Sequence, residues 1–68
     1  MISKTQIDWI FAKERELLER FAEMPPRSDA EWQQLLTAAH ELERKARGHP
    51  LVVQMTVAII KYFEEEQT

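Results

Sequence analysis

The sequence has no cysteine and only two histidines among its 68 residues. Without cysteine, neither a disulfide framework nor a thiolate zinc site can stabilise the chain, and no oxidising compartment is implied. The segment HELE, which starts at His40, does not follow the His-Glu-x-x-His zinc pattern. We therefore predict a cytoplasmic protein that holds no metal and no cofactor.

Long apolar runs and an excess of positive charge are missing as well. The longest apolar run, LVVQMTVAII at 51–60, is shorter than the roughly 20 residues of a membrane-spanning helix. The first residues, MISKTQIDWIF, lack the basic start, apolar stretch and cleavage site of a signal peptide. The net charge of -3 argues against non-specific nucleic-acid binding, which depends on excess Lys and Arg. We predict a globular protein that does not associate with membranes.

Proline and glycine divide the sequence into three stretches of helical length. The breaks fall at Pro25-Pro26 and between Gly48 and Pro50. Short connections make sequential helices antiparallel neighbours, so the pattern predicts an all-α, up-down-up three-helix bundle. The bundle forms one helical domain over 1–68, with helices at about 4–24, 29–47 and 50–66.

Capping residues support these helix boundaries. Either Ser3 or Thr5 can cap the first helix, and Ser28 with Glu31 forms a capping box for the second. Gly48 suits a left-handed position after the second helix. These roles also account for both serines in the chain, which are its only serine or cysteine candidates for a nucleophile. Because the single glycine also rules out a glycine-rich phosphate loop, the sequence argues against an enzyme.

The third helix is more apolar than a bundle of this size requires. At 100° per residue, its apolar side chains cover roughly 220° of arc, whereas two neighbouring helices bury about 160°. Its polar strip consists of Gln54, Ala58, Lys61 and Glu65. The first helix, by comparison, places on one predicted core face the residues Ile7, Ile10, Phe11, Leu17, Leu18, Phe21 and Met24.

The surplus apolar surface predicts protein–protein association through the third helix. A two-fold homodimer is the simplest solution, since such dimers are the commonest oligomers, and a different protein partner is the alternative. The predicted contact residues are the anchors Val53, Val57 and Ile60, with Lys61 at a polar rim. The flank that carries Met55 and Tyr62 is the other candidate. The sequence thus indicates a small non-enzymatic interaction or oligomerisation module.

Trp9 is a second candidate contact. It points away from the apolar face of the first helix and shares a strip of that helix with Ile2. Exposed tryptophan is enriched among the residues that dominate binding energy at interfaces. The simpler interpretation is that the N-terminal segment or a neighbouring helix covers the indole.

Glu14 lies in the middle of the apolar face of the first helix. A carboxylate there must be paired, protonated or beside a packing gap. We favour a structural role in which Glu14 bonds to His40 or Thr56 and fixes the register of helix packing. The functional alternative is contact with a ligand or the handling of a proton, but no second carboxylate or nucleophile has a recognisable relation to Glu14.

The basic residues at the end of the second helix suggest an alternative function. Arg44, Lys45 and Arg47 could contact phosphates, which would suit a nucleic-acid-associated regulator that acts as a dimer. Cations at this position also interact favourably with the negative end of the helix dipole, which is sufficient reason for their presence. A helix-turn-helix mode is disfavoured, since the third helix offers bases only Gln54 and Lys61 as donors.

Overall fold

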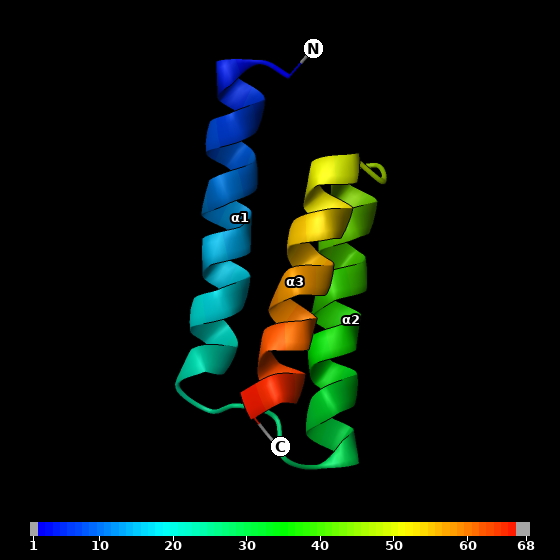
Figure 1. The fold of residues 1–68 in the computed structure, drawn as a ribbon. Coiled ribbons are helices and arrows are strands. Elements are labelled where there is room, and N and C mark those ends of the chain that lie inside the picture. Colours follow the sequence, from blue (N-terminus) through cyan, green and yellow to red (C-terminus); the bar gives the residue numbers. More distant parts are fainter. Residues whose placement is uncertain (1, 67–68) are drawn as a thin grey trace.

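Three helices form the antiparallel up-down-up bundle that the sequence predicts (Figure 1). The computed structural model describes residues 2–66, and the bundle measures 38 × 18 × 17 Å. Helices α1 (Lys4–Ala22) and α3 (Pro50–Glu66) run in the same direction, and α2 (Asp29–Lys45) runs in the opposite one. No helix in the described part of the chain is long and apolar enough to cross a membrane.

Reciprocal capping boxes begin the first two helices. The Ser3 hydroxyl accepts from the Gln6 N–H at 3.1 Å, and the Gln6 side chain accepts from the Ser3 N–H at 2.8 Å. Ser28 and Glu31 repeat this arrangement at the start of α2, at 3.2 Å and 3.1 Å. The structure therefore selects Ser3, not Thr5, as the cap of α1. Each box satisfies two backbone donors that a helix start leaves unpaired.

Two helices end two residues earlier than predicted. Helix α1 stops at Ala22, because Pro25 disfavours helical backbone in the residue before it. Helix α2 stops at Lys45, where the Gly48 N–H donates to the Glu43 carbonyl at 2.9 Å and the Arg47 N–H donates to the Arg44 carbonyl at 3.0 Å. This pair of bonds is a Schellman motif.

The left-handed backbone after α2 involves two residues. Gly48 has φ 71°, as the sequence predicts, but Arg47 precedes it with φ 56°. A left-handed conformation costs a residue that carries a Cβ roughly 1–2 kcal/mol, and glycine adopts it freely. Arg47 therefore holds a position that glycine would fill with less strain.

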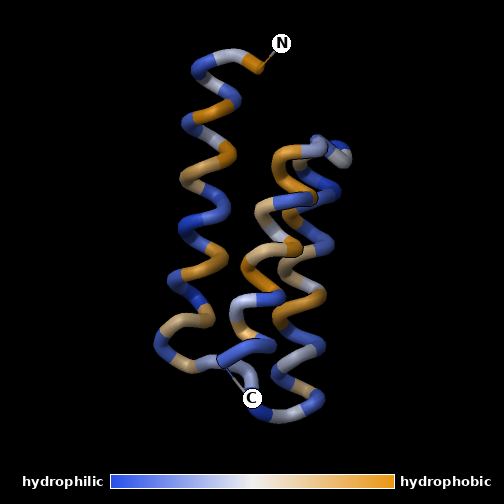
Figure 2. Tube along the Cα trace, viewed as in Figure 1, coloured by the Kyte–Doolittle hydropathy of each residue, from blue (hydrophilic) through white to orange (hydrophobic). Residues whose placement is uncertain are grey.

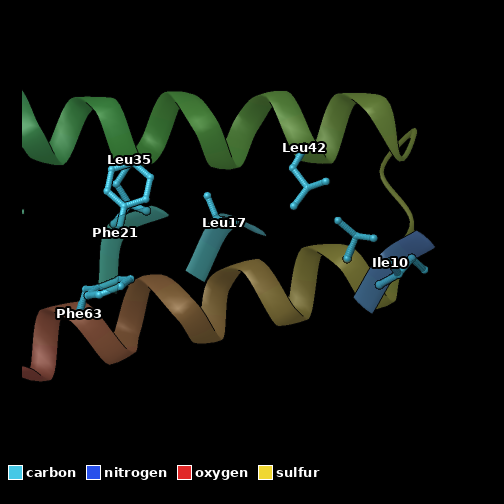
Figure 3. Packing of buried hydrophobic residues seen from close by; sticks show 7 residues of the cluster. Ile10, Leu17, Phe21, Leu35, Leu42 and Phe63 are labelled. Carbon is cyan, nitrogen blue, oxygen red and sulfur yellow. The ribbon is translucent and has the colours of Figure 1, made fainter. Parts of the chain in front are cut away.

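The core runs along the bundle axis, where side chains of all three helices converge (Figure 3). Val52 and Phe63 of α3 are the most completely enclosed of its apolar residues. Hydrophobic residues recur along each helix, and the last turn of α3 is hydrophilic (Figure 2). The buried apolar residues of the three helices are Ile10, Leu17 and Phe21 of α1, Leu35, Ala39 and Leu42 of α2, and Val52 and Phe63 of α3.

Helix α1 is only partly covered by its neighbours. Of its predicted core face, Ile7, Phe11 and Leu18 are exposed, and so is Met24 just beyond the helix. The N-terminal turns of α1 also extend past the nearest ends of α2 and α3 (Figure 1), and every residue from 3 to 9 is exposed. Part of the surplus apolar surface of this protein thus belongs to α1.

Candidate association surface

Glu14 and Thr56 form a buried polar pair between α1 and α3. The Thr56 hydroxyl donates to Oε1 of Glu14 at 2.9 Å, and the two residues are 0% and 3% exposed, respectively. Oε2 of Glu14 is buried and has no hydrogen-bond partner among the described residues. His40, the other predicted partner, lies on the surface.

The environment of Glu14 favours its neutral form. Loss of solvent raises the pKa of this carboxyl, and the nearby Glu43 carboxylate raises it further, while the Thr56 hydrogen bond acts in the opposite direction. Because both members of the pair are enclosed, neither could meet a substrate without opening of the bundle. The geometry agrees with the structural interpretation of Glu14.

The predicted anchors of α3 share one flank of that helix. Val53, Val57 and Ile60 follow one another at helical spacing, but the bundle covers them to different degrees. Val57 is 41% exposed, whereas Val53 and Ile60 are half-buried. Lys61, the predicted rim residue, is exposed. Val57 is therefore the most accessible of the three anchors.

A shallow apolar groove lies on the opposite flank of α3, where it meets α1. Its volume is about 340 Å³, and its walls are Leu18 and Ala22 of α1 and Ala58, Ile59 and Tyr62 of α3. Tyr62 is 50% exposed, and its ring meets Phe63 edge-on, with centroids 5.4 Å apart and planes at 67°. The groove thus has an aromatic wall that contacts a core ring.

Phe11 extends this apolar surface along α1. It stands seven residues before Leu18, which puts both side chains on one stripe of the helix. Phe11 is 55% exposed, the largest exposure of any aromatic side chain in the described chain. We call Phe11 and the five groove residues the side face.

The sequence pattern assigned most of the side-face residues to other roles, and among them it named only Tyr62 on a flank proposed for association. Phe11 and Leu18 fall on the predicted core stripe of α1, and Ala58 falls on the predicted polar strip of α3. The sequence signal that could have indicated the groove was side-chain size, because Ala22 and Ala58 are too small to fill the space beside Leu18 and Tyr62. Only the relative placement of the two helices shows that these residues meet.

Trp9 and the basic residues, which the sequence suggested separately, lie together at one end of the bundle. Trp9, Lys45 and Arg47 border an open cleft of about 330 Å³ between the start of α1 and the α2–α3 connection. His49 also borders it, and its Nδ1 accepts from the Leu51 N–H at 3.2 Å. Arg44 is exposed on the last turn of α2. This end of the molecule therefore combines positive charge with an exposed indole.

Comparisons with protein-family models, with curated proteins and with solved structures found no match to this chain. Within residues 2–66, no three His, Cys, Asp or Glu side chains are grouped so that they could hold a metal ion.

Proposed function

We propose that this protein is a non-enzymatic self-association module that pairs copies of the chain through apolar surface flanking α3. The observation that carries this proposal is the side face, where Tyr62, which is 50% exposed, forms one wall of an apolar groove and Phe11, which is 55% exposed, lies farther along α1. Tyrosine is enriched among the residues that dominate binding energy at interfaces, and phenylalanine is enriched in interfaces generally. The proposal keeps the predicted association but moves its surface from the anchors Val53, Val57 and Ile60 to the other candidate flank, which carries Tyr62, and it adds α1 to that surface.

The total surface of the chain supports association. The accessible area is 5243 Å², whereas a compact monomer of 8.1 kDa exposes about 4,500 Å². The difference, about 750 Å², is close to the roughly 800 Å² that each partner contributes to a standard interface. Pairing would therefore remove about as much surface as the chain carries in excess.

Sedimentation equilibrium over a range of concentrations tests this function. We expect the wild type to dimerise and Tyr62→Glu to sediment as a folded monomer, because the variant places a charge on the side face. Val57→Glu is the matched variant on the other flank of α3, and loss of the dimer in that variant alone would place the interface at Val53, Val57 and Ile60. Met24→Glu is the control, since Met24 is exposed outside both flanks. A wild type that stays monomeric at every concentration refutes the function.

A nucleic-acid-associated regulator is the second candidate, and the cleft beside Trp9 is the observation in its favour. Lys45 and Arg47 border this cleft, and Arg44 lies near it. Binding to duplex DNA that weakens steeply with salt, and that Lys45→Glu and Arg47→Glu abolish, would support this candidate. The same variants leave the side face intact, so the two functions can be tested separately.

A further inference from the structure

We propose that the partner on the side face is a second copy of this chain, packed antiparallel about a two-fold axis, with Phe11 of each copy in the groove of the other. The inference rests on the proposed self-association and specifies its geometry. In such an interface the same contact occurs twice, so each chain needs only one groove and one protruding side chain, the knob, which is Phe11.

The spacing along α1 permits this exchange. The groove is centred between Leu18 and Ala22, which is about nine residues, or roughly 13 Å, beyond Phe11. A two-fold axis perpendicular to the bundle must lie midway along α1 between Phe11 and the centre of the groove, close to Arg15. Helix α1 runs from Lys4 to Ala22, so Arg15 is near its centre. The axis therefore passes near the middle of the bundle, where two antiparallel copies overlap along most of their length.

The groove matches the proposed occupant in size and polarity. Its volume, about 340 Å³, is near the lower limit for pockets that enclose small molecules, and one phenyl ring fits within it. Its walls are aliphatic except for the ring of Tyr62. Aromatic pairs favour offset or edge-to-face contacts, which Phe11 of the partner could make with that ring.

The charges at the two ends of the bundle select the antiparallel orientation. One end, residues 2–9 and 43–51, has four cations and two carboxylates, a net charge of +2. The other end, residues 19–31 and 63–66, has seven carboxylates and two arginines, a net charge of -5. The cations are Lys4, Arg44, Lys45 and Arg47, and the carboxylates of the acidic end are Glu19, Glu23, Asp29, Glu31, Glu64, Glu65 and Glu66.

Antiparallel pairing brings each basic end beside the acidic end of the other copy. A parallel pair would instead bring like charges together at both ends, which disfavours that arrangement. The attraction acts between exposed groups, so salt must weaken it. We expect the dimer dissociation constant to rise between about 0.1 M and about 1 M salt, where the Debye length falls from about 10 Å to about 3 Å.

Trans-complementation between two variants tests the contact. Phe11→Ala removes the knob, and Ala58→Trp fills the groove, so each should raise the dimer dissociation constant by at least about a hundredfold, because two contacts are lost per dimer. A mixture of the two should form a heterodimer tighter than either homodimer, since the intact Phe11 of one chain meets the intact groove of the other. Met24→Ala is the control, and circular dichroism confirms that each variant is folded.

Spin labels measure the orientation directly. The chain has no cysteine, so Thr5→Cys, on the exposed start of α1 and outside the side face, gives one label per copy. Thr5 lies about 15 Å along α1 from Arg15, so the antiparallel dimer separates the labels by about 30 Å or more. A parallel dimer brings them within about 10–20 Å, because packed helices lie 8–10 Å apart.

These outcomes separate the inference from the function beneath it. A wild type that never dimerises overturns both. A wild-type dimer with the short label distance, or one that tolerates Phe11→Ala without weakening, overturns the antiparallel contact and leaves self-association standing. The long distance together with trans-complementation supports both.

Discussion

Glu14 and Thr56 are 42 positions apart in the sequence, yet the Thr56 hydroxyl lies 2.9 Å from Oε1 of Glu14. The bond joins the centre of α1 to the second turn of α3, inside a core that is otherwise apolar. A shift of either helix by one residue would separate the pair and leave the carboxyl unbonded in the core. The pair therefore favours one register of α1 against α3, at the cost of burying an ionisable group.

The pH dependence of stability should reflect the raised pKa of Glu14. The unfolded chain releases this proton near pH 4.3, while the folded chain holds it to higher pH because its pKa is raised. Between the two pKa values the folded state binds more protons, so the contribution of Glu14 to the free energy of unfolding falls as pH rises and then levels off. We expect Glu14→Gln to lose this slope and to gain stability over the wild type with increasing pH, as measured by urea unfolding. If the difference in free energy of unfolding between Glu14→Gln and the wild type is the same at every pH, Glu14 ionises normally.

Removing the hydroxyl of Thr56 should destabilise the fold. Thr56→Val preserves the shape of the side chain but leaves both oxygens of Glu14 without a partner, which costs about 1–3 kcal/mol at neutral pH. Thr37→Val is the matched control, because Thr37 is exposed on α2 and its change should stay within about 0.5 kcal/mol. Similar losses in the two variants would mean that the bond contributes nothing.

Replacing both partners should restore stability and loosen the register. The double variant Glu14→Leu with Thr56→Val removes the buried polar groups together, so we expect its free energy of unfolding to equal or exceed that of the wild type. Amide chemical-shift dispersion and the dimer dissociation constant report whether the helices still adopt a single alignment. A double variant as unstable as Thr56→Val alone would contradict this account of the pair.

Arg47→Gly should stabilise the protein. Arg47 has φ 56°, where glycine avoids the steric cost of a Cβ, so we expect a gain of about 1 kcal/mol in thermal or urea unfolding. Arg44→Gly is the matched control, because it removes the same charge from a residue inside α2 and should cost about 1 kcal/mol. A loss in both variants would indicate that the Arg47 side chain makes a contact more valuable than the relief of strain.

Loss of the α2 capping box should be measurable. Ser28→Ala removes the acceptor for the Glu31 N–H and should cost about 1 kcal/mol, whereas Ser28→Gly should cost only a few tenths. Hydrogen bonds from the backbone N–H of Arg27 and from Ser28 lower the pKa of Glu31. The support from Glu31 is therefore present above its unfolded pKa and is lost as pH falls through the lowered folded value. Thr5→Ala, which removes the alternative cap of α1, should change little.

Most of the fold follows from local signals in the sequence. The serine caps, the paired prolines and Gly48 determine where helices begin and end, because these residues act through their own backbone and nearest neighbours. Thr56 was one of two partners that helical spacing offered Glu14. Choosing it over His40 required knowing which faces of α2 and α3 meet the centre of α1.

The association surface was less predictable for a related reason. The width of the apolar arc on α3 indicated surplus apolar surface. That estimate treats each helix alone, so it does not show how far a neighbouring helix covers each flank. Val53 and Ile60 are half-buried, while Phe11 and Leu18, which resemble core residues in projection, are exposed. Side chains at the edge of a stripe become core or surface according to interhelical placement, which depends on all three helices together.

The extension of α1 beyond the other helices has a consequence for the motions of the chain. Residues 3–9 have no buried side chain among them, and beyond the capping box the contacts at this end are the packing of Ile2 against the core and the position of Trp9 beside the α2–α3 connection. Their amide protons should exchange with deuterium sooner than those around Leu17, because local opening there exposes little of the core. The first two turns of the chain should therefore fray and re-form while the remainder stays folded, and the indole of Trp9 is placed to report it by fluorescence.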